Sequence, residues 1–190
     1  MIRNYALSFI LLVGLCGCSL TPESYQEPKL TFEHLKTPLE VDVRSATVVN
    51  QYQAPLIDGH MEYKFVNDPV VTLTQLIQKR IKAVGDRNFI SFKIEEASMM
   101  ERDIDRDDDF FDLFNIQNAN EYEGKIVVLM ELLDDRNTPL TGHRITVKRR
   151  TTIPHDASII DRQKIGFTML ERLMKDFDTK MSDLLIAHYQ

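Results

Sequence analysis

The densest run of side chains that could bind a metal ion covers residues 103–109 and contains five aspartates. Alternating carboxylates offer the hard oxygen ligands that Ca²⁺ prefers, and Asp103 begins a run with the spacing of a calcium-binding loop. Two positions do not fit. Asp108 stands where such a loop needs glycine for its turn, and Phe114 stands where it needs a bidentate glutamate. A solvated loop over Asp103 to Asp109 is therefore the favoured interpretation, with calcium binding as the alternative.

A basic cluster lies on a strand expected over residues 143–153. Because side chains alternate along a strand, Arg144, Lys148 and Arg150 would share one side and Arg149 would point the other way. Arginine offers bidentate donors, so these three residues are a candidate site for an anionic ligand: a phosphate or carboxylate on a glycolipid, a phospholipid or an acidic partner. The simpler interpretation is a solvated strand face whose charges are balanced by nearby acids.

Apolar side chains follow the acidic run directly. Phe110, Phe111, Leu113 and Phe114, followed by Ile116, concentrate apolar surface in a segment that otherwise has the composition of a loop. This cluster is either a small satellite core or an exposed patch for docking a partner, since contiguous exposed apolar area marks interaction sites.

Known catalytic and metal-binding patterns are missing from the sequence. The five histidines are scattered, without the spacing of a helical zinc site. There is no Gly-x-Ser-x-Gly elbow, no glycine-rich phosphate loop and no Cys-x-x-Cys pair. We therefore expect a protein that is not an enzyme, with no cofactor and no metal.

The elements that position these residues follow from periodicity. Partial alternation predicts a strand over residues 39–51, a short strand or extended arm over 61–66, and a strand over 88–98 whose apolar face includes Phe92 and Ile94. Two further strands, over 124–133 and 143–153, flank a turn-rich segment that suits an antiparallel hairpin.

Two helices are expected. Asp68 can cap a helix with Pro69 in its first position, and apolar residues continue at helical spacing until Gly85. Ser158 and Asp161 resemble a capping box at the start of a long second helix, whose apolar stripe runs from Ile160 to Leu184.

The predicted fold is α+β: a two-layer β-α-β-β-β-α sandwich with a mainly antiparallel sheet and both helices on one face. The expected organisation is a signal peptide over residues 1–17, a lipidated N-terminus and flexible tether over 18–38, and a single domain over 39–190. The chain of 190 residues has a net charge of −6. Nucleic acid is therefore an unfavourable partner, because binding it needs clustered positive charge.

The N-terminus predicts export. Arg3 precedes an apolar run over residues 5–15 that is too short to span a membrane, which is typical of a secretory signal peptide. Leu15-Cys16-Gly17-Cys18 resembles the lipobox of bacterial lipoproteins, and this resemblance implies cleavage before Cys18 and its acylation. Ser19 follows where aspartate would favour inner-membrane retention in that family, so the resemblance implies anchoring in the outer membrane, with the domain on its periplasmic face.

The mature chain resembles small bacterial envelope lipoproteins in the order of its elements. Among these are the auxiliary lipoproteins of ABC-type lipid-transport systems and the lipoprotein of the lipopolysaccharide-assembly translocon. Residues 63–69, Tyr-Lys-Phe-Val-Asn-Asp-Pro, stand before Leu73, Leu76 and Ile77 and are similar to the aromatic-then-proline start of a helix in the first group.

The expected function is that of a noncatalytic, membrane-anchored accessory or scaffold component of an envelope transport or assembly complex. Its docking surface would be the long helix or the residues 110–116. The alternative is a lipid or glycolipid carrier in which Arg144, Lys148 and Arg150 hold an anionic headgroup. The expected partners are thus the membrane, through Cys18, an envelope protein complex and, in the alternative, a lipid ligand.

Overall fold

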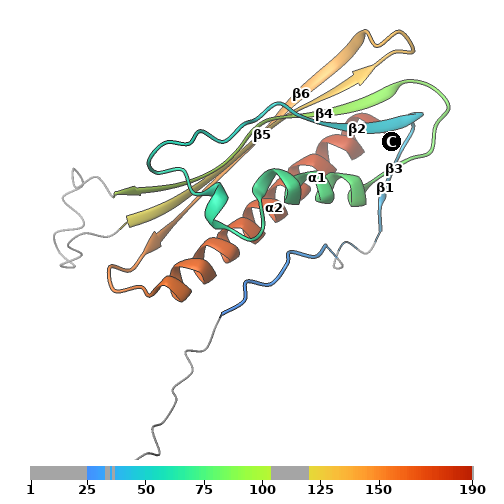
Figure 1. Cartoon of the computed structure of the whole chain (residues 1–190). Helices are drawn as coiled ribbons and strands as arrows, with labels where there is room; N and C mark the ends of the chain where they lie inside the picture. Colours follow the sequence, from blue (N-terminus) through green and yellow to red (C-terminus); the bar gives the residue numbers. More distant parts are fainter. Residues whose placement is uncertain (1–24, 33–34, 36, 104–119, 190) are drawn as a thin grey trace, which may run out of the picture.

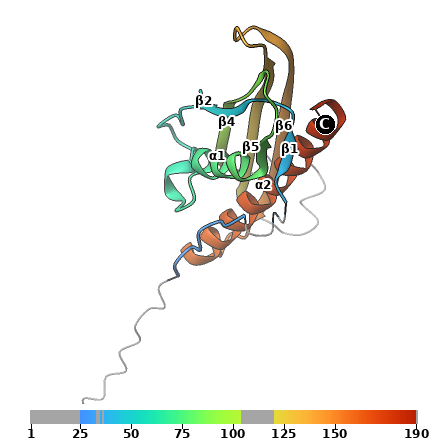
Figure 2. The ribbon, with the colours of Figure 1, turned by 90° about the vertical axis from the view of Figure 1, so that its right-hand side faces the viewer.

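The structure is a computed structural model that describes residues 25–32, 35, 37–103 and 120–189. It is an α+β fold in which two helices cover one face of a four-stranded sheet (Figure 1). The strand order is β2-β4-β5-β6, with β4, β5 and β6 antiparallel and β2 parallel to β4. Both helices lie on the same side of this sheet (Figure 2), as the sequence predicts.

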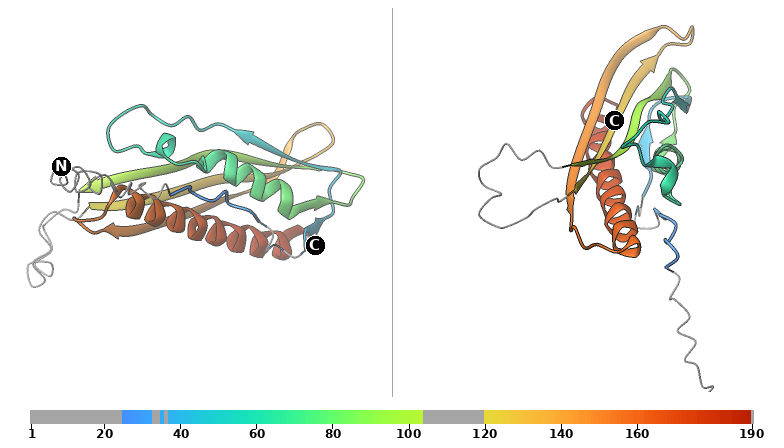
Figure 3. Two further views of the ribbon diagram at one scale, coloured as in Figure 1. Left: turned by 60° about the horizontal axis from the view of Figure 1, so that its bottom comes forward. Right: turned by 60° about the vertical axis from the view of Figure 1, so that its left-hand side comes forward.

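Three long strands form the body of the sheet: β4 (Phe89–Asp103), β5 (Asn120–Leu133) and β6 (Pro139–Ile153). Each is longer than its sequence pattern indicates. At about 3.3 Å per residue they extend for about 50 Å, close to the length of the 31-residue helix α2 (Ile159–Tyr189) at about 1.5 Å per residue. The helix runs along the length of these long strands (Figure 3).

A bulge in β4 changes which side chains face the helices. Before it, Phe92 and Ile94 are buried on the helix side as predicted, and the register with β5 shifts between Ile94 and Glu96. After it, the buried residues Ala97 and Met99 continue the core in the opposite phase. The bulge therefore keeps the twisted strand amphipathic over its whole length.

The β5–β6 hairpin has the turn that its sequence predicts. The Asp134 carboxylate accepts hydrogen bonds from the backbone N–H groups of Arg136 and Thr138, at 2.8 and 2.7 Å. Asn137 takes a φ of 60°, a left-handed conformation that asparagine tolerates better than most residues.

The beginning of the domain differs from the single strand expected over residues 39–51. It forms two strands in different sheets: β1 (Leu39–Val41) pairs in parallel with β3 (Ile81–Ala83), and β2 (Ser45–Asn50) joins the main sheet. The strand or arm expected over 61–66 is a 3₁₀ turn, Glu62–Lys64. The order of elements is thus β-β-α-β-β-β-β-α.

Helix α1 (Pro69–Arg80) begins as predicted, because the Asp68 carboxylate accepts a hydrogen bond from Val71 N–H at 2.9 Å. It ends earlier than Gly85, since residues 81–83 leave the helix to form β3. Its last residue, Arg80, donates to Asp178 at 3.0 Å and to Ser182 at 3.2 Å, both on α2. This contact fixes the two helices against each other.

The start of α2 confirms the capping box. Ser158 Oγ accepts a hydrogen bond from Asp161 N–H at 3.2 Å, and the Asp161 carboxylate accepts one from Ser158 N–H at 3.3 Å. The helix then buries a stripe that includes Leu170, Phe177 and Leu185. It stays packed to its C-terminal end, where His188 stacks on His143 of β6.

Candidate binding site on the open face of the sheet

The face of the sheet opposite the helices is covered by charged side chains in ion pairs. Lys93 of β4 contacts Glu131 of β5 at 2.5 Å, and Lys125 of β5 contacts Glu96 of β4 at 2.6 Å. Both pairs are diagonal, since Lys93 lies opposite Leu129 and Lys125 lies opposite Ser98, and diagonal neighbours on one face of a sheet are within reach of long side chains. The face is consequently polar but almost neutral along much of its length.

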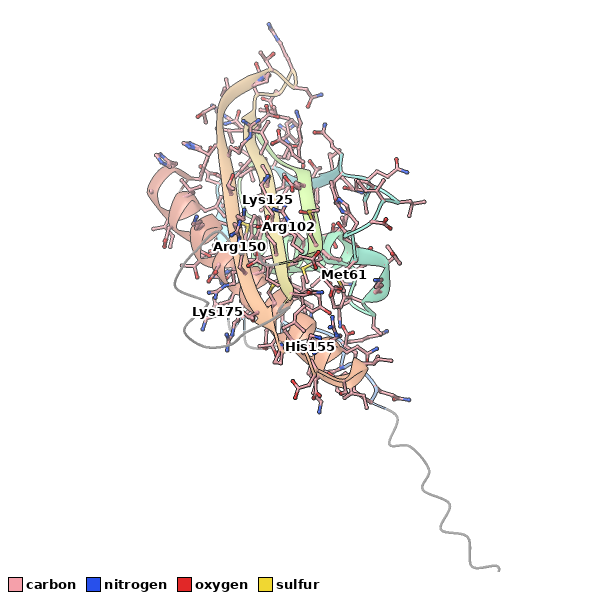
Figure 4. The ribbon with its side chains drawn as sticks, turned by 90° about the vertical axis from the view of Figure 1, so that its left-hand side faces the viewer. Met61, Arg102, Lys125, Arg150, His155 and Lys175 are labelled. Atoms are coloured by element: carbon pink, nitrogen blue, oxygen red, sulfur yellow. The ribbon has the colours of Figure 1, made fainter. Side chains whose placement is uncertain are left out.

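The exception is a cluster around Glu123 of β5. Its carboxylate is contacted by three cations: Arg150 at 2.7 Å and Lys148 at 2.9 Å from β6, and Arg102 at 3.3 Å from β4. A second carboxylate, Glu121, lies 3.7 Å from Arg150. Figure 4 labels Arg102 and Arg150 on the strands that flank β5. We call these five residues the Glu123 cluster.

The electrostatics of the Glu123 cluster follow from burial and partners. Glu123 is only 4% exposed. Burial acts to raise the pKa of its carboxyl, but the hydrogen bond from Lys148, the charge of Arg102 and the hydrogen bond from Arg150 outweigh burial, and the pKa is lowered from its ordinary value. Glu123 is therefore an anion at neutral pH.

The cluster has an excess of positive charge that solvent can reach. Three cations face two carboxylates, and the side chains of Lys148, Arg102 and Arg150 are 44%, 45% and 53% exposed. Their remaining N–H donors can bind phosphate or carboxylate oxygens of a ligand at this surface.

The predicted anion-site residues divide into two groups. Arg144, Lys148 and Arg150 share the open face as alternation predicts, but only Lys148 and Arg150 meet at Glu123. Arg144 forms a separate bidentate pair with Glu95, at 2.9 and 3.0 Å. All three cations thus have the acidic neighbours that the simpler interpretation expected.

Arg149 points to the other face, again as alternation predicts. There it forms a bidentate pair with Asp176 of α2, at 2.5 and 2.9 Å, and so joins the sheet to the helix.

Three members of the Glu123 cluster, Arg102, Glu121 and Glu123, are not found from the sequence. Arg102 lies beyond the strand end expected at Ser98, and the two glutamates lie before the strand start expected at Gly124. Extending the strands would not have been enough, because the bulge between Ile94 and Glu96 is what moves Arg102 out of the phase of Phe92 and Ile94 and onto the open face.

Several predicted sites lie outside the described residues. They are the acylation site Cys18, the apolar patch Phe110, Phe111, Leu113 and Phe114, and all of the acidic run except Asp103, which ends β4. Within the described part of the chain, no group of three or more histidine, cysteine or acidic residues could hold a metal ion. No helix there is both long and apolar enough to cross a membrane.

Comparisons with known proteins give structural matches alone. No protein-family model matches this chain, and no curated sequence matches it. A minor lipoprotein from Acinetobacter baumannii aligns over 77% of this chain and 93% of its own, with 8% identity and a TM-score of 0.45.

Two further solved structures have the same degree of likeness. Rare lipoprotein B from Shewanella oneidensis aligns over 76% of this chain and 98% of its own, with 13% identity and a TM-score of 0.41. A lipoprotein from Caulobacter crescentus aligns over 72% and 83%, with 12% identity and a TM-score of 0.41.

Proposed function

We propose that this chain is a noncatalytic lipoprotein, anchored in the outer membrane through an acylated Cys18, that acts on the periplasmic side as an accessory or scaffold component of an envelope transport or assembly complex. The observation that carries the proposal is the docking of residues 25–32 onto the domain. Together with the lipobox-like sequence before Cys18, this docking would hold the whole domain beside the membrane.

The docked segment is fixed mainly by one side chain. The amide of Asn67, which is buried, donates to Glu27 at 2.6 Å and to the carbonyl of Pro28 at 2.9 Å, and it accepts from Leu30 N–H at 2.8 Å. Phe32 inserts into the core and is 5% exposed. The sequence predicts a flexible tether up to residue 38, whereas residues 25–32 pack on the domain.

Docking limits how far the domain can lie from Cys18. Tyr25 already contacts the domain, since Lys164 of α2 lies 5.5 Å from its ring centroid. Tyr25 stands seven positions after Cys18, and seven Cα–Cα steps of about 3.5 Å reach about 25 Å. A tether free to residue 39 would reach about 70 Å. An anchor at Cys18 would therefore keep the start of α2 close to the lipid.

The accessory role is tested by crosslinking the anchored protein in cells, followed by mass spectrometry of what co-purifies with it. We expect a reproducible set of membrane proteins, and we expect Cys18→Ala to lose them, because that variant keeps the domain but not the anchor. A monomer without partners in both samples would contradict the role.

A second function, binding of an anionic lipid or glycolipid, is favoured by the excess positive charge of the Glu123 cluster. In this alternative Lys148 and Arg150 hold the headgroup together with Arg102, and Arg144 lies at the margin. Native mass spectrometry of the detergent-extracted protein would show retained lipid. Replacing Lys148 and Arg150 with glutamine should remove it, while Lys175→Gln on the exposed side of α2 should not; retention in both variants would rule out this site.

A further inference from the structure

A groove runs between the edge strand β6 and helix α2. It has a volume of about 230 Å³ and is lined by residues 149–151 of β6 and by one side of α2. The half-buried Ile165 and the buried Met169 form its apolar floor, and Lys164 and Arg172 stand at its rim. A groove between a strand edge and a helix is a geometry that accepts an extended peptide as an added strand.

The outer edge of β6 carries free backbone groups, and the hydrogen bonds of β4 show which ones. Glu101 N–H donates to the carbonyl of Gly59 at 2.7 Å, and the carbonyl of Met99 accepts from Met61 N–H at 2.8 Å. The backbone N–H and C=O groups of the odd-numbered residues at this end of β4 therefore point away from β5. Because backbone groups alternate along a strand, the even-numbered residues bond to β5.

The same alternation continues across the sheet. Glu123 lies opposite Met100, so its backbone groups bond to β4. The backbone groups of the next residue, Gly124, therefore bond to β6, where Gly124 lies opposite Arg149. The backbone N–H and C=O groups of the even-numbered residues of β6 therefore point outward, to the free edge. Near the groove these are Lys148, Arg150 and Thr152.

One contact supports this assignment independently. Lys180 of α2, which lies outside the sheet, donates to the carbonyl of Thr146 at 2.8 Å, so an even-numbered carbonyl does point to the free edge. Among the described residues, no hydrogen-bond partner meets the backbone groups of the next three even-numbered positions. They can pair with one more strand of about five residues.

The charge of the groove selects the partner. Arg172 is exposed and makes no ion pair within the described part of the chain. Lys164 is also exposed, and no acidic side chain lines the groove. The neighbouring cations Lys148 and Arg150 lie along the same strand on the open face. An added strand would therefore place its side chains among cations on both faces.

We propose that the free edge of β6 and its groove with α2 bind an acidic, extended segment of a partner protein as a fifth strand of the sheet. Its backbone pairs with Lys148, Arg150 and Thr152. Alternate apolar side chains lie on Ile165 and Met169, and acidic side chains meet the cations on either side. The inference rests on the proposed function only for where that partner is found, in the envelope complex.

A second copy of this chain is a poor occupant of the edge. Residues 139–153 contain Arg144, Lys148, Arg149 and Arg150 and no acidic residue. Pairing two such strands would bring like charges opposite one another, which destabilises a sheet. The edge lysine and arginines are also a known protection of edge strands against self-association.

The proposal is tested on the detergent-solubilised full chain with a fluorescein-labelled peptide of alternating valine and glutamate, seven residues long and blocked at both ends. We expect saturable binding in fluorescence anisotropy. In hydrogen exchange read by mass spectrometry, the amides of Lys148, Arg150 and Thr152 should exchange quickly in the free protein and slowly with the peptide. The same peptide with lysine in place of glutamate should not bind.

Two variants of one residue separate backbone pairing from charge. Arg150→Pro removes the outward N–H without touching the β5–β6 ladder, a position at which edge strands accept proline, and should weaken binding about tenfold or more. Arg150→Gln keeps the N–H and should weaken binding by less. If Arg150→Pro does not fold, an N-methyl group on a central peptide amide gives the corresponding change on the ligand and should also weaken binding.

Three results would overturn the proposal. The first is slow exchange of the three amides in the free protein, which would mean that the same chain or a second copy covers the edge. The second is peptide binding without protection of these amides. The third is equal binding of the peptide with and without the N-methyl group. Recovery of an envelope complex by crosslinking, with a closed β6 edge, would leave the proposed function standing and reject this surface alone.

Discussion

At the scale of single residues, Glu123 is the centre of the open face. It is buried between strands yet ionised, and three cations converge on it from two neighbouring strands. A carboxylate in such a site stabilises the fold through its partners, and its removal leaves those partners repelling one another.

We predict that Glu123→Gln lowers the free energy of unfolding by about 1 to 2 kcal/mol, less than for a fully buried pair because the cations are about half exposed. The measurement is urea unfolding followed by circular dichroism. Glu95→Gln is the matched control, since Glu95 pairs with Arg144 alone at a more exposed position; its cost should stay within about 0.5 kcal/mol. Equal costs for the two variants would refute the central role of Glu123.

Two buried carboxylates with lowered pKa values, Glu123 and Glu62, contribute to the acid sensitivity of the fold. For Glu62, burial acts to raise the pKa, but hydrogen bonds from His60, Tyr52 and the backbone outweigh it, so the pKa lies below the ordinary value of 4.5. Since both folded pKa values lie below the unfolded ones, their stabilisation is fully present above about pH 4.5 and is lost as the pH falls further.

We therefore predict that the free energy of unfolding falls between about pH 5 and pH 3, as measured by urea unfolding at a series of pH values. The double variant Glu62→Gln, Glu123→Gln should be less stable at pH 7 and should show a shallower decline. An unchanged slope in the double variant would mean that other carboxylates determine the acid response.

The sequence determined the faces of the basic residues but not their partners. Alternation is a local property, so Arg144, Lys148 and Arg150 were placed together and Arg149 opposite from the sequence alone. That Lys148 and Arg150 share Glu123 with Arg102 depends on the register of β4, β5 and β6, which no local pattern encodes. Arg144 pairs with Glu95 instead, because it stands four positions before Lys148 along β6, which places it about 13 Å away.

At the scale of elements, the crossing of α2 with the loop before α1 depends on one glycine. A Cβ atom built on Gly166 would lie 2.2 Å from Phe65 Cε1, inside the closest approach of two carbon atoms. Phe65 has little room to move, because it is buried and packs edge-on against Tyr122. The glycine is thus required by close approach, at a helix position where alanine would otherwise be preferred.

We predict that Gly166→Ala destabilises the protein by about 1 to 3 kcal/mol, through overpacking that exceeds the gain in helix propensity of about 1 kcal/mol. Urea unfolding measures it. Adding Phe65→Leu should recover part of the loss. A single variant more stable than the parent would show that Phe65 moves aside at little cost.

Element by element, local signals were confirmed and non-local ones were missed. The cap of α2 at Ser158 and the hairpin turn at Asp134 are specified by neighbouring residues, and both form as predicted. The β1–β3 pair was missed because three-residue strands have almost no periodicity and a parallel pair is joined through a whole helix. The early end of α1 at Arg80 follows from the same pairing.

The docked N-terminal segment is an element that one substitution should release. We predict that Asn67→Ala leaves the domain folded but raises hydrogen exchange and protease cleavage within residues 25–32, because three hydrogen bonds to that segment are lost. Gln51→Ala, which truncates an exposed amide side chain just after β2, is the control and should leave the segment unchanged. Full protection in Asn67→Ala would mean that Phe32 alone holds it.

At the scale of the whole molecule, we propose that Cys18 carries lipid and begins the mature chain, and that the docked segment holds the domain beside this anchor. The most direct measurement is mass spectrometry of the N-terminal peptide from protein extracted from cell membranes. We expect a peptide that starts at Cys18 and carries acyl chains; a mature chain that starts elsewhere, or an unmodified Cys18, would contradict the proposal.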